Sequence, residues 1–287
     1  SNISILKYIN NLGLGLDAVS IEEVRTGIKC GYDVKKILFT PNGVNFSEIE
    51  EAMALGVKIN LDSLESLIDF SKAYPNETVS VRINPGVKAG GNENISVGHI
   101  DSKFGITEES IDKIVKMDEE KKIKVTTLHI HTGSDIIENN HFELGIKKIF
   151  LIAHKFKNIE TIDLGGGIKI PYFFGDTETD LNKYAEVINE EVKKFKLTKG
   201  KELKIIFEPG KFLVSDSGYF ITKVNYLKKS SKNTFVQVNS GFNHFVRPTL
   251  YKSYHEIVNL SNPMDKKFDY SVVGYICEKD TFAENRK

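Results

Sequence analysis

The feature that most constrains this chain is a regular alternation of short β-rich runs with amphipathic helical segments over roughly its first two hundred residues. Strands that alternate with helices at this spacing predict a parallel sheet with helices packed against it. The predicted strands span 14–19, 36–39, 58–61, 79–83, 125–130, 160–164 and 203–207, and the predicted helices span 4–11, 20–29, 46–55, 63–73, 108–116, 142–155 and 181–195.

The number of strands indicates which parallel sheet this is. Seven strands are one fewer than the eight of a closed (β/α)8 barrel of TIM type. The chain also opens with a helical segment that has no strand before it. The simplest interpretation is an α/β chain whose residues 1–219 form such a barrel, with the first barrel strand upstream of Ser1 and missing from this chain.

The pattern changes in the last third of the chain. Helical periodicity is weak there, and β-rich segments occupy 218–227, 234–238 and 270–276. A few strands alone do not close a stable sheet. We therefore expect a second, β-rich domain over 220–287 that is incomplete in this chain.

The composition excludes several classes of protein. Lys+Arg and Asp+Glu both number 39, so the net charge gives no indication of a nucleic-acid or membrane-surface partner. Cys30 and Cys277 are too few for a disulfide framework, which favours a reducing compartment, and we expect a cytoplasmic protein. No apolar run approaches the ~20 residues of a membrane span.

Three consecutive glycines follow the strand predicted at 160–164. Gly165, Gly166 and Gly167 let backbone N–H groups approach a ligand without a Cβ in the way, which suits a phosphate. A flexible turn is the alternative interpretation. The neighbouring strand ends decide between the two, because barrel active sites lie where strands run into the following loops.

Two histidines end the strand predicted at 125–130. His129 and His131 are two residues apart, so both point toward the barrel interior. His131 is nearer the strand end and is expected to reach a pocket, whereas His129 is expected to be a hydrogen-bonded core histidine. The His-x-His spacing is also typical of metal ligands, so a metal hydrolase remains an alternative.

Two further strand ends carry polar groups. Ser134 offers a hydroxyl and Gly133 a backbone N–H, both of them phosphate donors, although an ordinary turn would have the same residues. Glu208 ends the last strand before Pro209 and Gly210, where its carboxylate can pair with a protonated ring nitrogen. A plain surface glutamate is the alternative there.

With these residues placed, the chain resembles the fold-type III decarboxylases that depend on pyridoxal 5′-phosphate, and within them the branch that acts on meso-2,6-diaminopimelate. The resemblance covers essentially the whole sequence. It rests on matching segments in the same order, namely LDAVS (16–20), NLDS (60–63), RINPG (82–86), SKFG (102–105), HIHTGS (129–134), DLGGG (163–167), EPGK (208–211), GFNHFVRP (241–248), LY (250–251), YH (254–255) and CE (277–278).

The resemblance implies a cofactor site. His131 would stack on the ring of pyridoxal 5′-phosphate, and Glu208 would keep its pyridine nitrogen protonated. The implied phosphate and cofactor contacts are Ser134, Gly165, Gly166, Gly167, Pro209, Gly210 and Lys211, with Arg82 near the phosphate and Asp17 also in the cofactor-binding set.

The resemblance also implies substrate contacts and a homodimer. Lys211, Arg247 and Tyr251 would bind a substrate carboxylate, and Glu278 would bind the distal ammonium. Cys277, catalytic together with His131, would donate a proton after CO2 leaves. Cys277 and Glu278 would reach the pocket of the other subunit, so that the two subunits share their active sites.

The chain departs from the family pattern at two places. Lys211 stands where the family has Arg, which keeps the charge and loses the bidentate fork. The lysine that anchors the family's cofactor covalently lies on the first barrel strand, upstream of Ser1. The chain as given is therefore expected to be inactive or nearly so, and it also lacks the contacts that the family supplies after Lys287.

The activity implied is decarboxylation of meso-2,6-diaminopimelate to L-lysine and CO2, a carbon–carbon lyase step of lysine biosynthesis. The alternatives are a decarboxylase of ornithine or carboxynorspermidine, and a non-catalytic barrel that carries pyridoxal 5′-phosphate. Arg247 and Tyr251 favour a substrate with a second carboxylate. The β-rich segment and the Cys277–Glu278 pair argue against a carrier, which needs neither.

Overall fold

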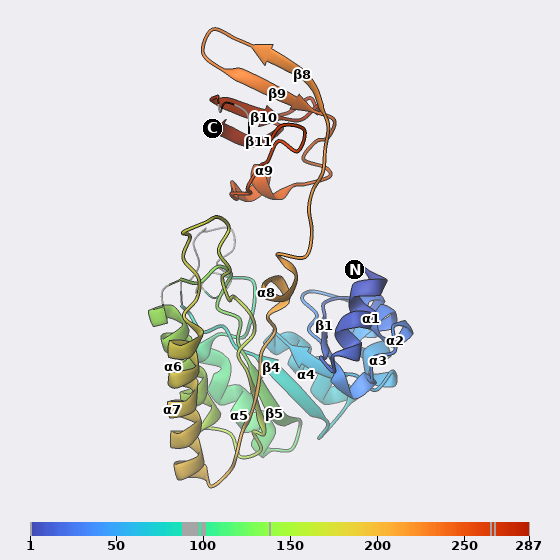
Figure 1. Ribbon diagram of the computed structural model, residues 1–287. Helices are drawn as coiled ribbons and strands as arrows, with labels where there is room; N and C mark the ends of the chain where they lie inside the picture. Colours follow the sequence, from blue (N-terminus) through green and yellow to red (C-terminus); the bar gives the residue numbers. More distant parts are fainter. Residues whose placement is uncertain are drawn as a thin grey trace. The chain divides into compact units, whose positions relative to one another are not determined.

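The computed structural model describes residues 2–87, 98, 102–137, 139–264, 266 and 268–286 (Figure 1). They form two compact units. The first comprises Ser1–Lys169 and Thr179–Phe212, and the second comprises Ile170–Glu178 and Leu213–Lys287. This division falls at 212/213, whereas the sequence placed a boundary at 219/220, and it assigns 170–178 to the second unit.

The first unit contains a seven-stranded sheet in which every strand pairs in parallel with the next strand of the sequence. This TIM-like half-barrel confirms the predicted α/β fold class. Its strands are β1 (Leu16–Ala18), β2 (Ile37–Phe39), β3 (Lys58–Leu61), β4 (Thr78–Arg82), β5 (Lys124–His129), β6 (Thr161–Asp163) and β7 (Lys204–Ile206).

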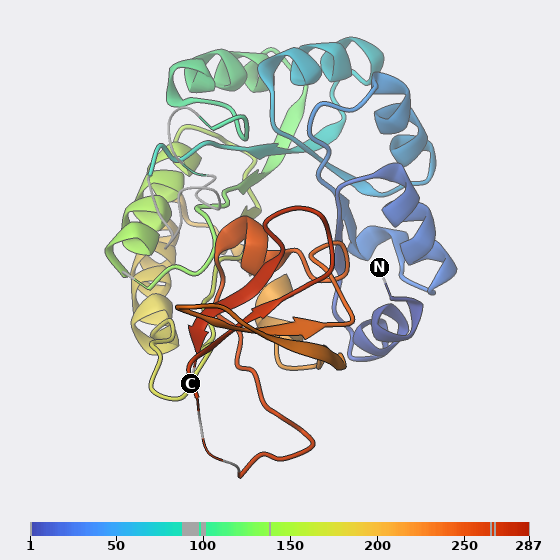
Figure 2. The ribbon, with the colours of Figure 1, turned by 90° about the horizontal axis from the view of Figure 1, so that it is seen from above.

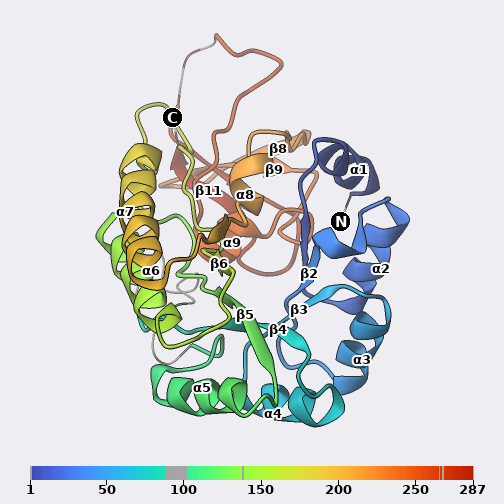
Figure 3. The ribbon, with the colours of Figure 1, turned by 90° about the horizontal axis from the view of Figure 1, so that it is seen from below.

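Helices form an outer arc around the strands of this unit, as Figures 2 and 3 show. Their bounds are α1 (Ile3–Asn11), α2 (Ile21–Lys29), α3 (Phe46–Ala54), α4 (Leu64–Ala73), α5 (Ile111–Glu119), α6 (Asn139–Ala153) and α7 (Leu181–Lys199), with short 3-10 turns η1 (Val34–Lys36) and η3 (Glu108–Ser110).

Local side-chain hydrogen bonds fix where these helices begin. Ser20 caps α2 by accepting from the backbone N–H of Glu23, as the first residue of a capping box does. The Glu23 carboxylate accepts in return from the N–H of Val19, one residue earlier than in the usual box. Gly200 ends α7 in the left-handed conformation, with φ of +65°.

The hydrophobic core lies between the sheet and the inner helix faces. Leu128 on β5 and Ile162 on β6 are fully buried, as are Leu67 on α4 and Ile149 on α6. Strands covered in this way are expected to be apolar along most of their length. The polar side chains that do occur on these strands, near their carboxyl ends, therefore need another explanation.

The second unit contains a mixed four-stranded sheet in the order β11-β10-β9-β8. Its small core is formed by Val238, Val272 and Ala283. The sheet confirms the predicted β-rich segment. The elements of this part are β8 (Val224–Lys229), β9 (Thr234–Val238), β10 (Tyr270–Val273), β11 (Thr281–Arg286) and helix α9 (Arg247–Tyr251), with the five-residue helix α8 (Gly210–Val214) before them.

The sequence did not predict strand β11 or helices α8 and α9. Strand β11 has charged and polar residues at most positions, and its pairing with β10 determines its conformation. Helices α8 and α9 are five residues long, too short to show periodicity. Among the described residues, no helix has the length and apolar character needed to cross a membrane.

Truncation of Ile149 should test the described packing of α6. Its side chain is fully buried, whereas Leu151 on the same helix is 65% exposed. We expect Ile149→Ala to lower the free energy of unfolding of the first unit by about 2–5 kcal/mol, because it leaves a cavity. Leu151→Ala, the matched control, should change it by about 0.5 kcal/mol or less. If urea unfolding shows that both variants lose the same free energy of unfolding, the buried position of Ile149 is contradicted.

Candidate active site

Three ionisable side chains lie side by side where neighbouring strands end. Arg82 on β4 is in register with His129 on β5, and His129 is in register with Asp163 on β6. Glu208, just after β7, joins them through a 3.1 Å contact between His129 Nε2 and Glu208 Oε2. One ligand atom from each of His129, Asp163 and Glu208 lies within 4.8 Å of the others. The strand register thus builds a compact buried cluster.

Burial dominates the electrostatics of this cluster. It raises the pKa of Asp163 and of Glu208 to about 7 each, with the negative charge of Glu208 adding to the effect at Asp163. Desolvation and the negative charge of Glu208 also raise the pKa of Asp17 on β1 to about 6, although Asp17 is more exposed than the other two carboxyl groups. Adjacent buried carboxyl groups do not all ionise at neutral pH, so they share protons as a coupled set.

Arg82 is the cation of this cluster. Burial lowers its pKa, and the carboxylates of Asp62, Glu208 and Asp17 act against that effect. Its guanidinium lies 4.7 Å from the ring centre of Phe104. Arg82 therefore compensates the buried negative charge from the side of β4. The resemblance placed it near the cofactor phosphate, and that role stays a prediction.

The glycine triplet is a close-packed turn, and each of its glycines is required. A Cβ on Gly165 would lie 2.5 Å from the carbonyl oxygen of Ile130, and one on Gly166 would lie 2.5 Å from that of Glu208. Gly165 and Gly167 also have positive φ, of +64° and +103°. The turn is thus wedged between the loop after β5 and the loop after β7.

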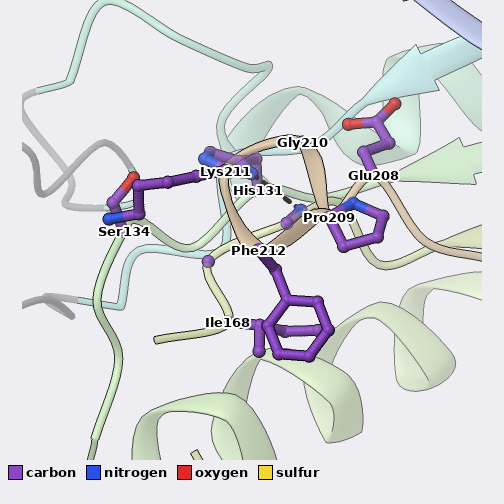
Figure 4. Close-up of a pocket in the computed structure, with 10 residues that line it drawn as sticks. His131, Ser134, Ile168, Glu208, Pro209, Gly210, Lys211 and Phe212 are labelled. Carbon is purple, nitrogen blue, oxygen red and sulfur yellow. Dashed lines mark hydrogen bonds between the residues drawn. The ribbon is translucent and has the colours of Figure 1, made fainter. Parts of the chain in front are cut away.

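His131 lies directly against this turn. Its Nδ1 accepts a 3.1 Å hydrogen bond from the N–H of Gly166, drawn as a dashed line in Figure 4. Burial, helped by the positive charge of Arg82, lowers the pKa of His131 to about 3. The ring is therefore neutral at pH 7, with its proton on Nε2. A neutral flat ring at this position suits stacking on an aromatic ligand.

These loops enclose a pocket, shown in Figure 4. It combines backbone N–H groups, a hydroxyl, an ammonium, a carboxyl group and an imidazole, so it can take an anionic group attached to an aromatic ring. The pocket is lined by His131, Ser134, Gly166, Gly167, Ile168, Glu208, Pro209, Gly210, Lys211 and Phe212. Most of the predicted cofactor residues therefore meet at this pocket, whereas Gly165, Arg82 and Asp17 are not among the residues that line it.

Lys211 has a partner that the sequence did not reveal. Its ammonium forms an ion pair with the carboxylate of Asp135, and the two side chains are only 28% and 13% exposed. Asp135 follows Ser134 directly and has a positive φ of +56°. Part of the Lys211 charge is thus balanced by Asp135, so a phosphate or substrate carboxylate would compete with Asp135 for this ammonium.

The remaining predicted site residues belong to the second unit. Arg247 and Tyr251 lie at the two ends of α9, with the guanidinium 5.7 Å from the ring centre, and Arg247 also donates to the hydroxyl of Tyr172 at 3.4 Å. Cys277 is a free, exposed thiol, and Glu278 follows it in the turn between β10 and β11. Their roles stay predictions.

Some site residues escaped the sequence analysis. Asp163 was seen only as part of a matching segment, although a carboxylate ending a buried strand was a usable signal. His129 was expected to be a hydrogen-bonded core histidine, and its bond to Glu208 fits that expectation. Neither Asp135 nor Phe212 carried a signal, because their positions depend on how the loops pack.

Comparisons with known proteins place this geometry in context. Residues 1–215 match the family model described as pyridoxal-dependent decarboxylase, pyridoxal binding domain. A diaminopimelate decarboxylase of Methanothermobacter thermautotrophicus is 34% identical over 298 residues, which cover 100% of this chain and 69% of that protein.

Solved structures of decarboxylases are also similar to this chain. The structure of diaminopimelate decarboxylase from Helicobacter pylori complexed with L-lysine has a TM-score of 0.89 and 30% identity, covering 99% of this chain and 72% of that one. A lysine/ornithine decarboxylase from Vibrio vulnificus, complexed with putrescine, has a TM-score of 0.81 at 18% identity. It covers 99% of this chain and 74% of that one, and this likeness concerns the fold alone.

Substitution of Gly166 should test the turn as an anion cradle. Gly166→Ala places a Cβ against the carbonyl of Glu208, so we expect at least about tenfold weaker binding of inorganic phosphate and about 1–3 kcal/mol lower stability. Gly218→Ala is the control, because a Cβ there meets no atom within 4 Å. Unchanged phosphate affinity in Gly166→Ala, measured by equilibrium dialysis, would exclude the cradle.

Proposed function

Because this chain belongs to the pyridoxal-dependent decarboxylase family, we propose that the protein decarboxylates meso-2,6-diaminopimelate to L-lysine and CO2. The observation that carries the proposal is the set of His131, the glycine turn and Glu208 around one pocket, in a chain 34% identical to a diaminopimelate decarboxylase. A structure of a relative complexed with L-lysine, the expected product, supports it.

The pocket residues fit pyridoxal 5′-phosphate, the family's cofactor. Glu208 Oε1 is buried and has no hydrogen-bond partner among the described residues, so it can accept from a protonated pyridine nitrogen. The neutral ring of His131 can stack on the pyridine. When bound, the cofactor supplies a conjugated ring that takes up the electron pair left as the bond to the substrate carboxylate breaks.

The phosphate would be held by backbone and side-chain donors together. The N–H of Gly167 and the hydroxyl of Ser134 suit a phosphate. The N–H groups of Gly165, Gly166 and Gly210 donate to Asp163, His131 and the Glu208 carbonyl, so each would have to exchange its partner to contact the anion. Lys211 would contribute its ammonium once the anion competes with Asp135 for it. Arg82 and Asp17 would complete the cofactor side of the site from β4 and β1.

Substrate recognition would use the second unit. Arg247 and Tyr251, with Lys211, would bind a substrate carboxylate, and Glu278 would pair with the distal ammonium. Cys277 would donate a proton to the carbon that has lost CO2. Following the resemblance, we propose a homodimer in which the Cys277 and Glu278 of each subunit serve the other subunit's site. We also propose that it works in the cytoplasm, where its thiols stay reduced.

Substrate preference is the direct test. The full-length gene product, supplied with pyridoxal 5′-phosphate, should release CO2 and form lysine from meso-2,6-diaminopimelate. We expect its kcat/KM for ornithine to be at least about 100-fold lower, because ornithine leaves the groups built for a second carboxylate unpaired. Coupled detection of CO2, with carboxynorspermidine as a third substrate, measures the ratio.

Each other outcome would favour one of the alternative functions. Preferential turnover of ornithine or carboxynorspermidine would replace the proposed substrate. Bound pyridoxal 5′-phosphate without turnover of any amino acid would favour a carrier. Stoichiometric zinc together with no absorbance from bound cofactor would favour the metal hydrolase.

A further inference from the structure

The two carboxylate oxygens of Glu208 have different surroundings. Oε2 lies 3.1 Å from His129 Nε2, whereas Oε1 has no hydrogen-bond partner among the described residues. In Figure 4 the carboxylate points away from the turn that carries Gly210. The orientation of this group therefore depends on what holds Oε2.

His129 is well suited to hold that oxygen. It is 1% exposed, and strand pairing fixes its backbone between Arg82 and Asp163. Burial lowers its pKa to about 4, so the ring is neutral and donates through one nitrogen. With Nε2 facing a carboxylate and Nδ1 without a partner among the described residues, the proton belongs on Nε2.

Asp163 is the second neighbour of Glu208. Its Oδ1 accepts from the N–H of Gly165 at 2.9 Å, and its Oδ2 is buried without a partner in the described part of the chain. Two carboxyl groups this close in a buried site share a proton. A hydrogen bond from His129 favours the ionised form of Glu208, and so leaves the shared proton on Asp163.

We propose that His129 is a positioning residue for the cofactor: its Nε2–H fixes Glu208 Oε2, so that Oε1 faces the ring nitrogen and Glu208 stays ionised while Asp163 carries the proton. This deepens the proposed function and rests on the pairing of Glu208 with the pyridine nitrogen. His131, by contrast, would contact the ring itself.

Other charged groups around the cluster are consistent with this assignment. Besides Asp163, the charges that act on His129 are those of Arg82 on β4, Asp17 on β1 and Asp62 at the end of β3. The donor atoms of His129, Asp163 and Glu208 could also hold a metal ion. The adjacent Arg82 guanidinium disfavours a second cation there, so we assign a hydrogen-bonded triad.

The test uses pyridoxine 5′-phosphate, which has no aldehyde and so reports on the pocket without a covalent bond to the protein. His129→Leu removes the donor, and His129→Gln keeps an N–H close to the Nε2 position. We expect His129→Leu to bind this ligand about 10- to 100-fold more weakly. The ¹⁵N shift of the labelled ring nitrogen should also move toward its unprotonated value. His129→Gln should restore both within about threefold of the original protein.

Controls separate the possible failures. Inorganic phosphate should bind equally to the original protein, His129→Leu and His129→Gln, because the cradle does not use His129. If His129→Leu alone loses phosphate binding, its fold is disturbed, and the affinity of His129→Gln for pyridoxine 5′-phosphate becomes the test. Glu208→Gln binding as tightly as the original protein would refute the pairing with the ring nitrogen, and with it the proposed function. Three results would overturn the role of His129 alone. The first is weaker binding of pyridoxine 5′-phosphate by Glu208→Gln with unchanged binding by His129→Leu. The second is a His129→Gln variant that does not regain the original affinity, and the third is stoichiometric zinc in the original protein that is lost in His129→Leu.

Discussion

The burial of the Glu208 carboxylate is the interaction on which the rest of this site depends. A buried carboxylate is costly unless hydrogen bonds and opposite charge compensate it. Here His129 supplies the hydrogen bond, Arg82 supplies the charge, and Asp163 can take the proton that Glu208 would otherwise hold. These residues come from separate strands, so only the completed sheet register assembles them.

The same register creates the cradle beside the cluster. Parallel strands that pair in sequence order bring the loops after β5, β6 and β7 together at one end of the sheet. The glycine turn after β6 fits between the other two loops only because it has no side chains. Anion donors and a ring-binding carboxylate thus become neighbours, and this arrangement serves an aromatic phosphate.

Much of this architecture follows from local sequence signals. The alternation of patterns was sufficient to predict the half-barrel, and β3 and β9 occupy the predicted residues 58–61 and 234–238. The strand ends showed where His131 and Glu208 lie. Contacts between distant segments could not be predicted from local patterns. The ion pair of Lys211 with Asp135 joins residues 76 positions apart, and β11 forms against β10 despite its polar sequence.

A crystal structure of the full-length protein with pyridoxal 5′-phosphate would test the central claim most directly. We expect the ring nitrogen within about 3.2 Å of Glu208 Oε1, with His129 still donating to Oε2. A ring nitrogen facing another group, or a metal ion coordinated by His129, Asp163 and Glu208, would contradict the claim.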